Sequence, residues 1–344
     1  MVDWSDRHFR FFLRQLAPRS LLYTEMHTTG AILRGKSEQI LDFDPAEGPV
    51  ALQVAGDDPA AISAAVRKAE GWPYAEYNLN CGCPSDKVQE GHFGACLMGE
   101  PALVGQLVRA MKDSTVKPVT VKHRIGITGR GVVRESYEDM VEFVEASAQA
   151  GADRFIVHAR IAMLEGLDPK QNREIPPLRY EDVHRLKRDF PELVIEINGG
   201  LRTVEAVLPQ LELVDGVMLG RAAYEDPYVM TALERAVFGD SLPQITRRAV
   251  VEAMIPYFDA WGAKGLRPHQ IAKHMTGLFA GFPGARRWRQ LLSPPFRPLS
   301  SPSDWMKQGL ELLPDWVLDS TDLRPSTREP GASSELRGVA AGTE

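Results

Sequence analysis

The sequence of 344 residues predicts an α/β fold, a (β/α)8 TIM barrel that is followed by a small all-α helical bundle. Between about residues 21 and 223, short apolar or β-branched runs alternate with longer helical patterns, which is typical of a parallel sheet with helical crossovers. Seven units of this spacing suit a closed barrel better than an open sheet. Beyond about residue 240 the strand pattern stops, and helical patterns with proline and glycine breaks continue to about residue 318.

The individual elements follow from these patterns in chain order. A first helix opens at Ser5 and Asp6, two residue types that cap helices well, and continues into an apolar run. The expected strands are Leu21–Met26, Val50–Ala55, Glu76–Asn80, Pro118–Arg124, Arg154–Ala159, Val194–Asn198 and Gly216–Leu219. The expected helices between the strands cover residues 58–70, 101–112, 135–150, 180–189 and 203–210.

An eight-stranded barrel needs one strand more than this pattern supplies. The missing first strand would precede the helix that opens at Ser5, where too few residues stand to form it. We therefore expect either a chain that begins after that strand or a barrel with a gap that something else covers. The expected domains are a barrel over residues 1–238, a helical domain over 239–318 and a disordered tail over 319–344, which is rich in serine, glycine, proline and charge.

Composition excludes several classes of protein. No stretch approaches the roughly 20 apolar residues of a membrane span, and the N-terminus lacks the apolar segment of a secretory signal, so we expect a cytoplasmic protein without membrane contact. Cys81, Cys83 and Cys96 are too few for a disulfide framework and lack the second cysteine pair of a zinc site. No metal is therefore expected.

The charge distribution is uneven. A net charge of −6 argues against a protein that is basic all over, yet no acidic residue lies between Asp259 and Asp304. The cations of this basic segment are Lys264, Arg267, Lys273, Arg286, Arg287, Arg289 and Arg297. They predict an anion-binding surface, with a solvated helix face as the alternative.

Polar residues and glycines recur where the expected strands end. They are Gln53, Asn78, Asn80, Cys83, Lys122, Arg124, His158, Arg160, Asn198, Gly199, Gly200, Gly220 and Arg221. Because the carboxyl ends of barrel strands meet at the active-site face, these residues are expected in one pocket. The late glycines suit a phosphate, with Lys122 and His158 facing the reactive end of the ligand. A phosphate-binding aldolase or isomerase stays open at this point.

Several motifs carry a more specific signal. They are YNLNCGCPS at 77–85 with QEG at 89–91 and GAC at 94–96, VKHR at 121–124, VHAR at 157–160, NGG at 198–200 and MLGRA at 218–222. Together they closely resemble the tRNA-dihydrouridine synthases. KQNREIPPL at 170–178 and PGARRWR at 283–289 resemble the A subfamily in particular, and the resemblance covers about residues 1–300.

The resemblance implies an FMN-containing barrel and a helical domain that reduce the C5=C6 bond of uridines in the tRNA D-loop, at positions 20 and 20a, with NADPH as reductant. Hydride would pass from reduced FMN to C6 and a proton from Cys83 to C5, which a thiol, mostly protonated at neutral pH, can supply. The implied FMN contacts are Met1, Gln53, Lys122, His158, Asn198, Gly199, Gly200, Gly220 and Arg221. The implied tRNA contacts are Asn80, Lys170, Arg173, Arg286 and Arg289. We expect a monomer without a protein partner.

One departure from the family concerns the N-terminus. Members usually carry a strand that ends in Ala-Pro-Met and touches the flavin, and here Met1 alone represents it. Two other functions stay open, an FMN-dependent small-molecule oxidoreductase of the dihydropyrimidine type and a non-catalytic RNA-binding protein. Cys81 and Cys96 are expected as buried filler residues, and Arg287 and Trp288 as packing residues of the helical domain.

Overall fold

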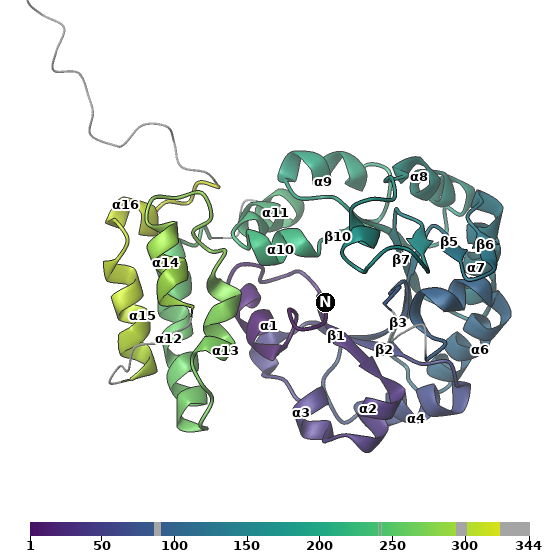
Figure 1. The fold of residues 1–344 in the computed structure, drawn as a ribbon, viewed down its shortest axis with the longest axis horizontal. Helices are drawn as coiled ribbons and strands as arrows, with labels where there is room; N and C mark the ends of the chain where they lie inside the picture. Colours follow the sequence, from purple (N-terminus) through teal and green to yellow (C-terminus); the bar gives the residue numbers. More distant parts are fainter. Residues whose placement is uncertain (86–90, 240, 242, 294–300, 324–344) are drawn as a thin grey trace, which may run out of the picture.

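The computed structural model describes residues 1–85, 91–239, 241, 243–293 and 301–323. Its centre is a curved sheet of seven strands with helices on the outer side (Figure 1). In spatial order the strands are β1 (Leu22–Thr28), β2 (Val50–Ala55), β3 (Glu76–Cys81), β4 (Val119–Arg124), β7 (Arg154–His158), β9 (Ile195–Asn198) and β10 (Gly216–Met218). Every neighbouring pair is parallel, which confirms the predicted α/β barrel class.

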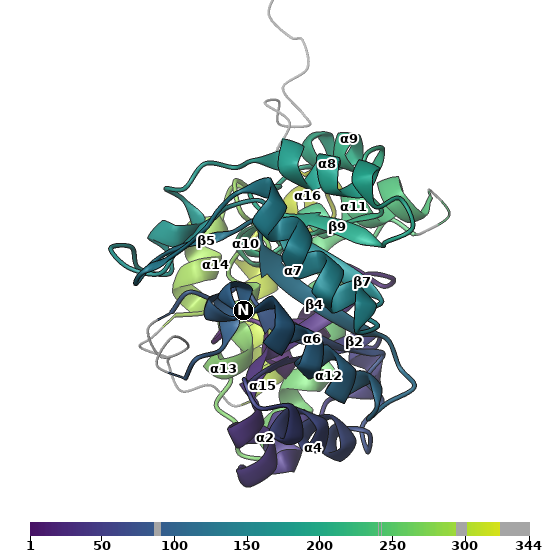
Figure 2. The ribbon, with the colours of Figure 1, turned by 90° about the vertical axis from the view of Figure 1, so that its right-hand side faces the viewer.

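The helices of the barrel lie outside the strands. They are α1 (Arg7–Arg14), α4 (Pro59–Ala69), α6 (Pro101–Lys112), α7 (Tyr137–Gln149), α8 (Tyr180–Asp189), α9 (Val204–Leu211), α10 (Arg221–Glu225) and α11 (Val229–Phe238). Of these, α1, α4, α7 and α9 begin at a side-chain cap. Asp58 caps α4, and Ser136 forms a capping box with Asp139 at the start of α7. Seen from the side, α6 and α7 cover the outer face of β4 and β7 (Figure 2).

The sheet is open between β10 and β1, because the described residues contain no pairing between these two strands. The N-terminal segment lies in this opening (Figure 1). The Asp3 N–H donates to Glu25 of β1, and the Trp4 ring stacks on Tyr224 of α10 with centroids 4.4 Å apart. This opening is the place where the sequence pattern is one strand short.

A second sheet and several short helices were not expected. The strands β5 (Ile127–Gly129), β6 (Val132–Arg134) and β8 (Ala162–Met163) form a small sheet beside the main one, in the order β6-β5-β8. The tip of the β5–β6 hairpin has positive φ at Gly129, Arg130 and Gly131. The short elements are α2 (Thr29–Arg34), α3 (Ser37–Leu41) and the 3-10 helices η1 (Pro45–Glu47), η2 (Gly94–Gly99) and η3 (Gln171–Arg173).

The C-terminal region is helical, as predicted. Its elements are α12 (Arg247–Ala263), α13 (His269–Ala272), η4 (Lys273–Met275), α14 (Ala285–Leu291), α15 (Pro302–Glu311) and α16 (Asp315–Leu318). Trp288 is fully buried and its Nε1 donates to the Met275 carbonyl, so it belongs to the helical core. No helix in the described ranges is long and apolar enough to span a membrane.

Part of the expected tail is held by the helical region. Arg247 is buried and donates to the carbonyls of Ser320 and Asp322, and Arg248 pairs with Asp319. Residues 319–323 are thus tied to α12, whereas residues 324–344 lie outside the described residues.

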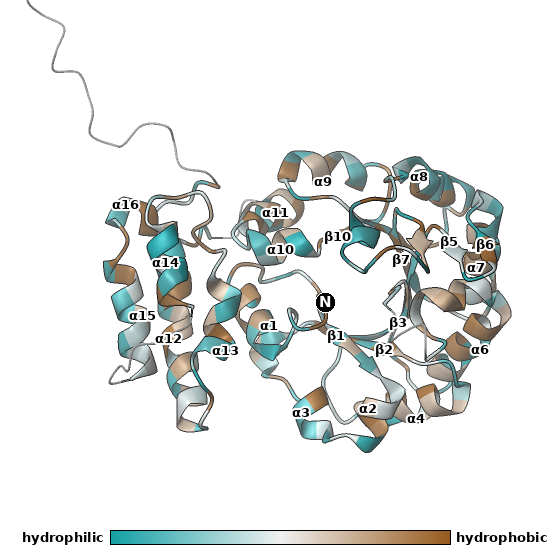
Figure 3. Cartoon of the chain, in the orientation of Figure 1, coloured by the Kyte–Doolittle hydropathy of each residue, from teal (hydrophilic) through white to brown (hydrophobic). Residues whose placement is uncertain are grey.

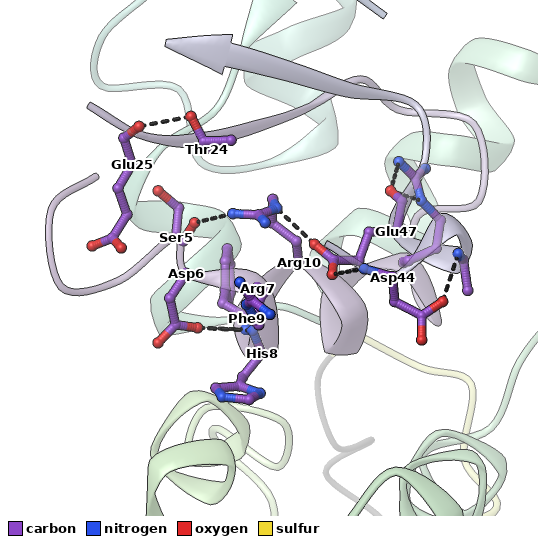
Figure 4. Close-up of polar contacts among 12 residues, drawn as sticks. Ser5, Asp6, Arg7, His8, Phe9, Arg10, Thr24, Glu25, Asp44 and Glu47 are labelled. Carbon is purple, nitrogen blue, oxygen red and sulfur yellow. Dashed lines mark hydrogen bonds and ion pairs between the residues drawn. The ribbon is translucent and has the colours of Figure 1, made fainter. Parts of the chain in front are cut away.

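The helix α1 joins the barrel to the helical region. Asp6 accepts hydrogen bonds from the N–H groups of His8 and Phe9 and from the ring of His274 in η4. Figure 4 shows this cap, and beside it the buried Arg10, which donates to the Glu47 carboxylate. Burial would raise the pKa of Asp6, but the hydrogen bond and charge of His274 hold that pKa well below its usual value. This hydrogen bond joins η4 of the helical region to the start of α1.

Candidate functional site

Cys83 lies directly after β3, in a loop that is held by a chain of amides. The Asn80 side-chain oxygen accepts from the N–H groups of Gly82 and Cys83, each at 3.1 Å. The Asn80 amide nitrogen donates to Gln53, whose own amide nitrogen donates to Asn78. Since an amide nitrogen carries two hydrogens, Asn80 keeps one for a ligand. The expected residues of β2 and β3 are thus brought together, and the Cys83 thiol is half-buried.

Cations surround the Cys83 loop. Lys122 of β4 lies close enough to Cys83 for their charges to interact. Among the described residues, its ammonium has no hydrogen-bond partner. Burial and the charge of Arg124 lower the pKa of Lys122 to about 8, while Cys83 opposes this shift. Burial and the charges of Arg124 and Lys122 hold the pKa of His158 well below its usual value. At neutral pH the site therefore contains a cationic lysine without an acceptor and an uncharged histidine.

The glycines after β9 leave room that a side chain would fill. Gly199 and Gly200 have φ of +119° and +73°, which side chains rarely adopt. A Cβ on Gly199 would lie 2.7 Å from the His158 ring, and a Cβ on Gly200 would lie 2.6 Å from Leu178. The backbone of Gly199, which has no side chain, therefore lies next to the His158 ring. Asn198 is fixed there because its amide donates to the Met218 carbonyl.

Met1 and Gly220 meet at the same end of the barrel. The Met1 Sδ lies 3.6 Å from the place of a Cβ on Gly220. Burial lowers the pKa of the α-amino group of Met1 to about 6, and the charges of Glu25, Lys122 and Cys83 act on it. Met1 thus lies beside the other expected cofactor residues.

The loop that carries Lys170 and Arg173 is tied to the last strand. Arg221 forms an ion pair with Glu174 at 2.8 Å and donates to the Arg173 carbonyl. Its guanidinium is therefore engaged with this loop. Lys170 is exposed and Arg173 is half-buried, with Cys83 among the charges that act on Arg173.

Three arginines of the basic segment lie on α14, in the helical region and not at the strand ends of the barrel. Arg286 and Arg289 are exposed, and so is Arg287, which we expected as a packing residue. Arg286 and Arg287 border a hollow of about 560 Å³ together with Glu311 of α15. In Figure 3, α14 is hydrophilic in colour. The expectation that Arg287 packs in the helical domain was wrong, because Arg286 and Arg287 are both exposed on this short helix. Arg297 lies outside the described residues.

The other two thiols are those of Cys81 and Cys96. Cys81 is fully buried and burial raises its pKa, as expected of a filler residue. Cys96 is half-buried in η2, and burial raises its pKa too. The described residues contain no cluster of three or more residues that would hold a metal ion.

Sequence reasoning missed the role of Arg124 and Asn172. The buried Arg124 donates to the carbonyls of Gly82, Ile161 and Asn172, and so connects the Cys83 loop with two later segments. Asn172 is fully buried and bonds the backbone of Met163 with both ends of its amide. In the sequence, the only signal was an asparagine between Lys170 and Arg173.

A parallel barrel whose strand ends bring together a thiol, a lysine without an acceptor, a neutral histidine and bare glycine backbone defines an enzyme of the anion-binding barrel class. Residues 1–303 match the family described as dihydrouridine synthase (Dus), and the chain belongs to this family. The resemblance drawn from the motifs is thereby confirmed.

Three curated relatives cover most of the chain, and each is named tRNA-dihydrouridine(20/20a) synthase. The relative from Pseudomonas aeruginosa is 51% identical over 313 residues, 91% of this chain and 93% of the relative. That from Synechocystis is 53% identical over 293 residues, 85% and 86% of the two chains. That from Escherichia coli K12 is 48% identical over 316 residues, 92% and 90%.

Proposed function

We propose that this protein is a tRNA-dihydrouridine synthase that reduces the C5=C6 bond of uridines 20 and 20a in the tRNA D-loop, with Cys83 as the proton donor. The observation that carries the proposal is the Cys83 loop, which Asn80 fixes beside Lys122 at the mouth of a barrel of this family. The relatives support the substrate, since their common name states it.

FMN fits the residues present. Enzymes of this family use FMN with NADPH as reductant. The acceptor-free Lys122 suits the anionic part of the cofactor, and the glycine backbone beside His158 suits close approach of its ring or phosphate. We propose that the residues that hold FMN are Met1, Gln53, Lys122, His158, Asn198, Gly199, Gly200, Gly220 and Arg221. When bound, FMN supplies the hydride that C6 of the uracil receives.

The chain's own residues perform the remaining steps. The uridine must leave the stack of the tRNA to reach the barrel mouth, which costs a few kcal/mol that contacts elsewhere offset. The free amide hydrogen of Asn80 is available to a uracil oxygen, and the same residue holds the Cys83 N–H. Cys83 then donates its proton to C5. Lys122 stabilises negative charge on the cofactor side of the uracil, opposite Cys83.

The proposal predicts a specific product. Wild-type protein with FMN, NADPH and unmodified tRNA is expected to add two hydrogens to uridines of the D-loop, which mass spectrometry of the digested tRNA detects. Free uridine or uracil is expected to remain unchanged. Reduction of the free base with no reduction of tRNA would instead identify a small-molecule oxidoreductase.

Lys122→Met is expected to weaken FMN binding roughly 10- to 100-fold, because a charge-assisted hydrogen bond contributes about 1.5–3 kcal/mol. Quenching of FMN fluorescence during titration measures the dissociation constant. Lys117→Met is the matched control, since Lys117 lies just before the same strand at the opposite end of the barrel. Equal affinity of the Lys122 variant and wild type for FMN would remove Lys122 from the cofactor site.

The double variant Arg286→Ala/Arg289→Ala is expected to raise the KM for tRNA and to reduce the log–log slope of binding against salt by up to about 1.8, at most about 0.9 per lost phosphate contact. Long-range repulsion from the net charge of −6 is screened beyond about 8 Å at physiological salt, so local cations dominate. Filter binding at several salt concentrations measures the slope.

A matched control exists on the barrel. Arg185 and Arg188 are exposed and are also three residues apart, on α8. Arg185→Ala/Arg188→Ala is expected to leave the slope unchanged. If the α14 variant also keeps the wild-type slope, the basic segment is a solvated surface and the tRNA is bound elsewhere.

We further propose that the chain consists of a barrel over 1–238, a tRNA-binding helical domain over 239–318 and a tail. We propose that the protein acts in the cytoplasm as a monomer. The hydrogen bond between His274 and Asp6 supports the division into a barrel and a helical domain, because it joins the two parts. Lys170 and Arg173 stand at the barrel side, and Arg286 and Arg289 at the helical side.

A further inference from the structure

A cavity of about 510 Å³ lies outside the residues assigned above to Cys83, FMN and tRNA. It is formed around β8 and the loop that follows, and its lining is mainly apolar. The apolar lining residues are Ile161, Met163, Leu167, Ile175, Pro176 and Pro177. Ile175 is 60% exposed, an unusual value for an isoleucine beside a cavity, so the cavity has an uncovered apolar edge.

The cavity adjoins the Cys83 loop. The guanidinium of Arg124 donates from Nε to the Gly82 carbonyl at 3.0 Å and from Nη1 to the Ile161 carbonyl at 3.2 Å. The same Nη1 donates to the carbonyl of Asn172, in the short helix that ends at Arg173. One planar group therefore contacts the thiol loop, the cavity wall and the segment proposed to contact tRNA.

The charges at the cavity favour a neutral ring with N–H groups over a phosphate. Glu135 and Glu165 line the cavity and are exposed, so they repel anions and accept hydrogen bonds. Among the described residues that line the cavity, the cation is Arg179, and it is engaged, since it pairs with Asp182 and donates to the Glu135 carbonyl. Apolar walls of proline and isoleucine with carboxylates at the edge suit the face of a nucleobase and the N–H groups along its rim.

We propose that this cavity binds the base of the nucleotide next to the uridine at Cys83. The inference rests on the proposed function. Extruding one base removes its stacking on both neighbours, and an apolar site for a neighbour offsets part of that loss. A substrate with two consecutive reactive uridines, 20 and 20a, then has one base at Cys83 and the other in the cavity.

The test is a double-mutant cycle between protein and RNA. Ile175→Asp places a charge at the apolar edge, and Ile175→Ala is a milder second variant. The side chain is exposed in the wild type, and thermal unfolding checks the fold of both variants. The RNA partners are the intact tRNA transcript and two transcripts with an abasic nucleotide on either side of the reacting uridine. Filter binding gives Kd for each pair without requiring turnover.

Ile175→Asp is expected to raise the Kd of intact tRNA roughly tenfold, because the contact with one base contributes about 1–3 kcal/mol. With one of the two abasic transcripts, the variant and wild type are expected to bind equally, because the contact is already absent. Val194→Asp, a similar change at the opposite end of the sheet, is expected to change nothing.

An unchanged Kd for intact tRNA with both Ile175 variants overturns the inference. So does a tenfold effect of Ile175→Asp that persists with both abasic transcripts, since the side chain would then act without either base. These binding results are separate from dihydrouridine formation by the wild-type protein, whose absence would overturn the proposed function instead.

Discussion

Replacing Cys83 with alanine is expected to lower the rate of dihydrouridine formation by about 10²- to 10⁴-fold, the usual contribution of a positioned general acid. The thiol is half-buried after β3, and Asn80 fixes its backbone N–H, so the loop geometry does not depend on the sulfur. Binding of FMN and of tRNA is therefore expected to stay near the wild-type values. Single-turnover measurements on pre-reduced protein separate this step from flavin reduction.

Cys96→Ala is the matched control, because Cys96 is also half-buried and lies thirteen residues further along the chain. It is expected to keep wild-type activity. Loss of activity in Cys96→Ala together with normal activity in Cys83→Ala would mean that the other thiol is the proton donor. Cys81→Ala is less informative, because Cys81 is fully buried and its removal leaves a cavity.

Acidification is expected to unfold the protein above pH 4, because several histidines are buried in the neutral form. Burial lowers the pKa of His8, His27 and His123 to about 4 and that of His158 well below its usual value. In the unfolded chain each has a pKa of about 6.5, so the unfolded state binds more protons. Stability is complete above pH 6.5 and falls as pH decreases toward 4, by up to about 1.4 kcal/mol per pH unit per histidine.

Three carboxylates act in the opposite direction, because burial raises the pKa of Glu25, Glu47 and Glu196. Burial raises the pKa of Glu47 to about 7 although Arg10 is next to it, so the folded state binds this proton first and gains stability as pH falls from 7. The four histidines outnumber these three carboxylates, so the net effect of acidification is a loss of stability, of about 4 kcal/mol per pH unit at most. Because domains of this kind are stable by about 5–15 kcal/mol, such a slope unfolds them within a few pH units.

Urea denaturation between pH 6.5 and 4.5 measures this slope. His123→Gln is expected to reduce it by about one proton, because His123 is fully buried and lies between Lys122 and Arg124. His92→Gln, at an exposed histidine, is expected to leave the slope unchanged. A slope for His123→Gln identical to that of wild type would show that buried histidines do not set the acid limit.

The sequence determined the order and type of the main elements. All seven predicted strands are present with ends shifted by at most two residues, and Val50–Ala55 matches in full. β2 and β3 are buried along their whole length, and β2 is apolar except at Gln53, which makes it easy to recognise. The β5–β6 hairpin was missed, because three-residue strands around a glycine turn have no periodicity to detect.

The candidate residues of the site were also accessible from sequence, because strand ends in a parallel barrel meet at one face whatever the loops do. The hydrogen bonds and ion pairs that those residues form could not be predicted from the sequence. Arg221 pairs with Glu174, 47 positions away, and Asp6 with His274, 268 positions away. Arg124 donates to three backbone carbonyls, which every residue type has, so the sequence does not indicate these partners.

The sequence by itself determined the barrel, the glycine-rich strand ends and the Cys83 motif, since each depends on local periodicity or on residues adjacent in the chain. Only the tertiary structure decided that Asn80 fixes the Cys83 loop, that Arg287 is exposed beside Arg286, and that an apolar cavity adjoins the site. Burial, pairing and cavity shape depend on which distant segments meet. That is a property of the folded chain, because a hydrogen bond or an apolar contact is set by distance in space and not by separation in sequence.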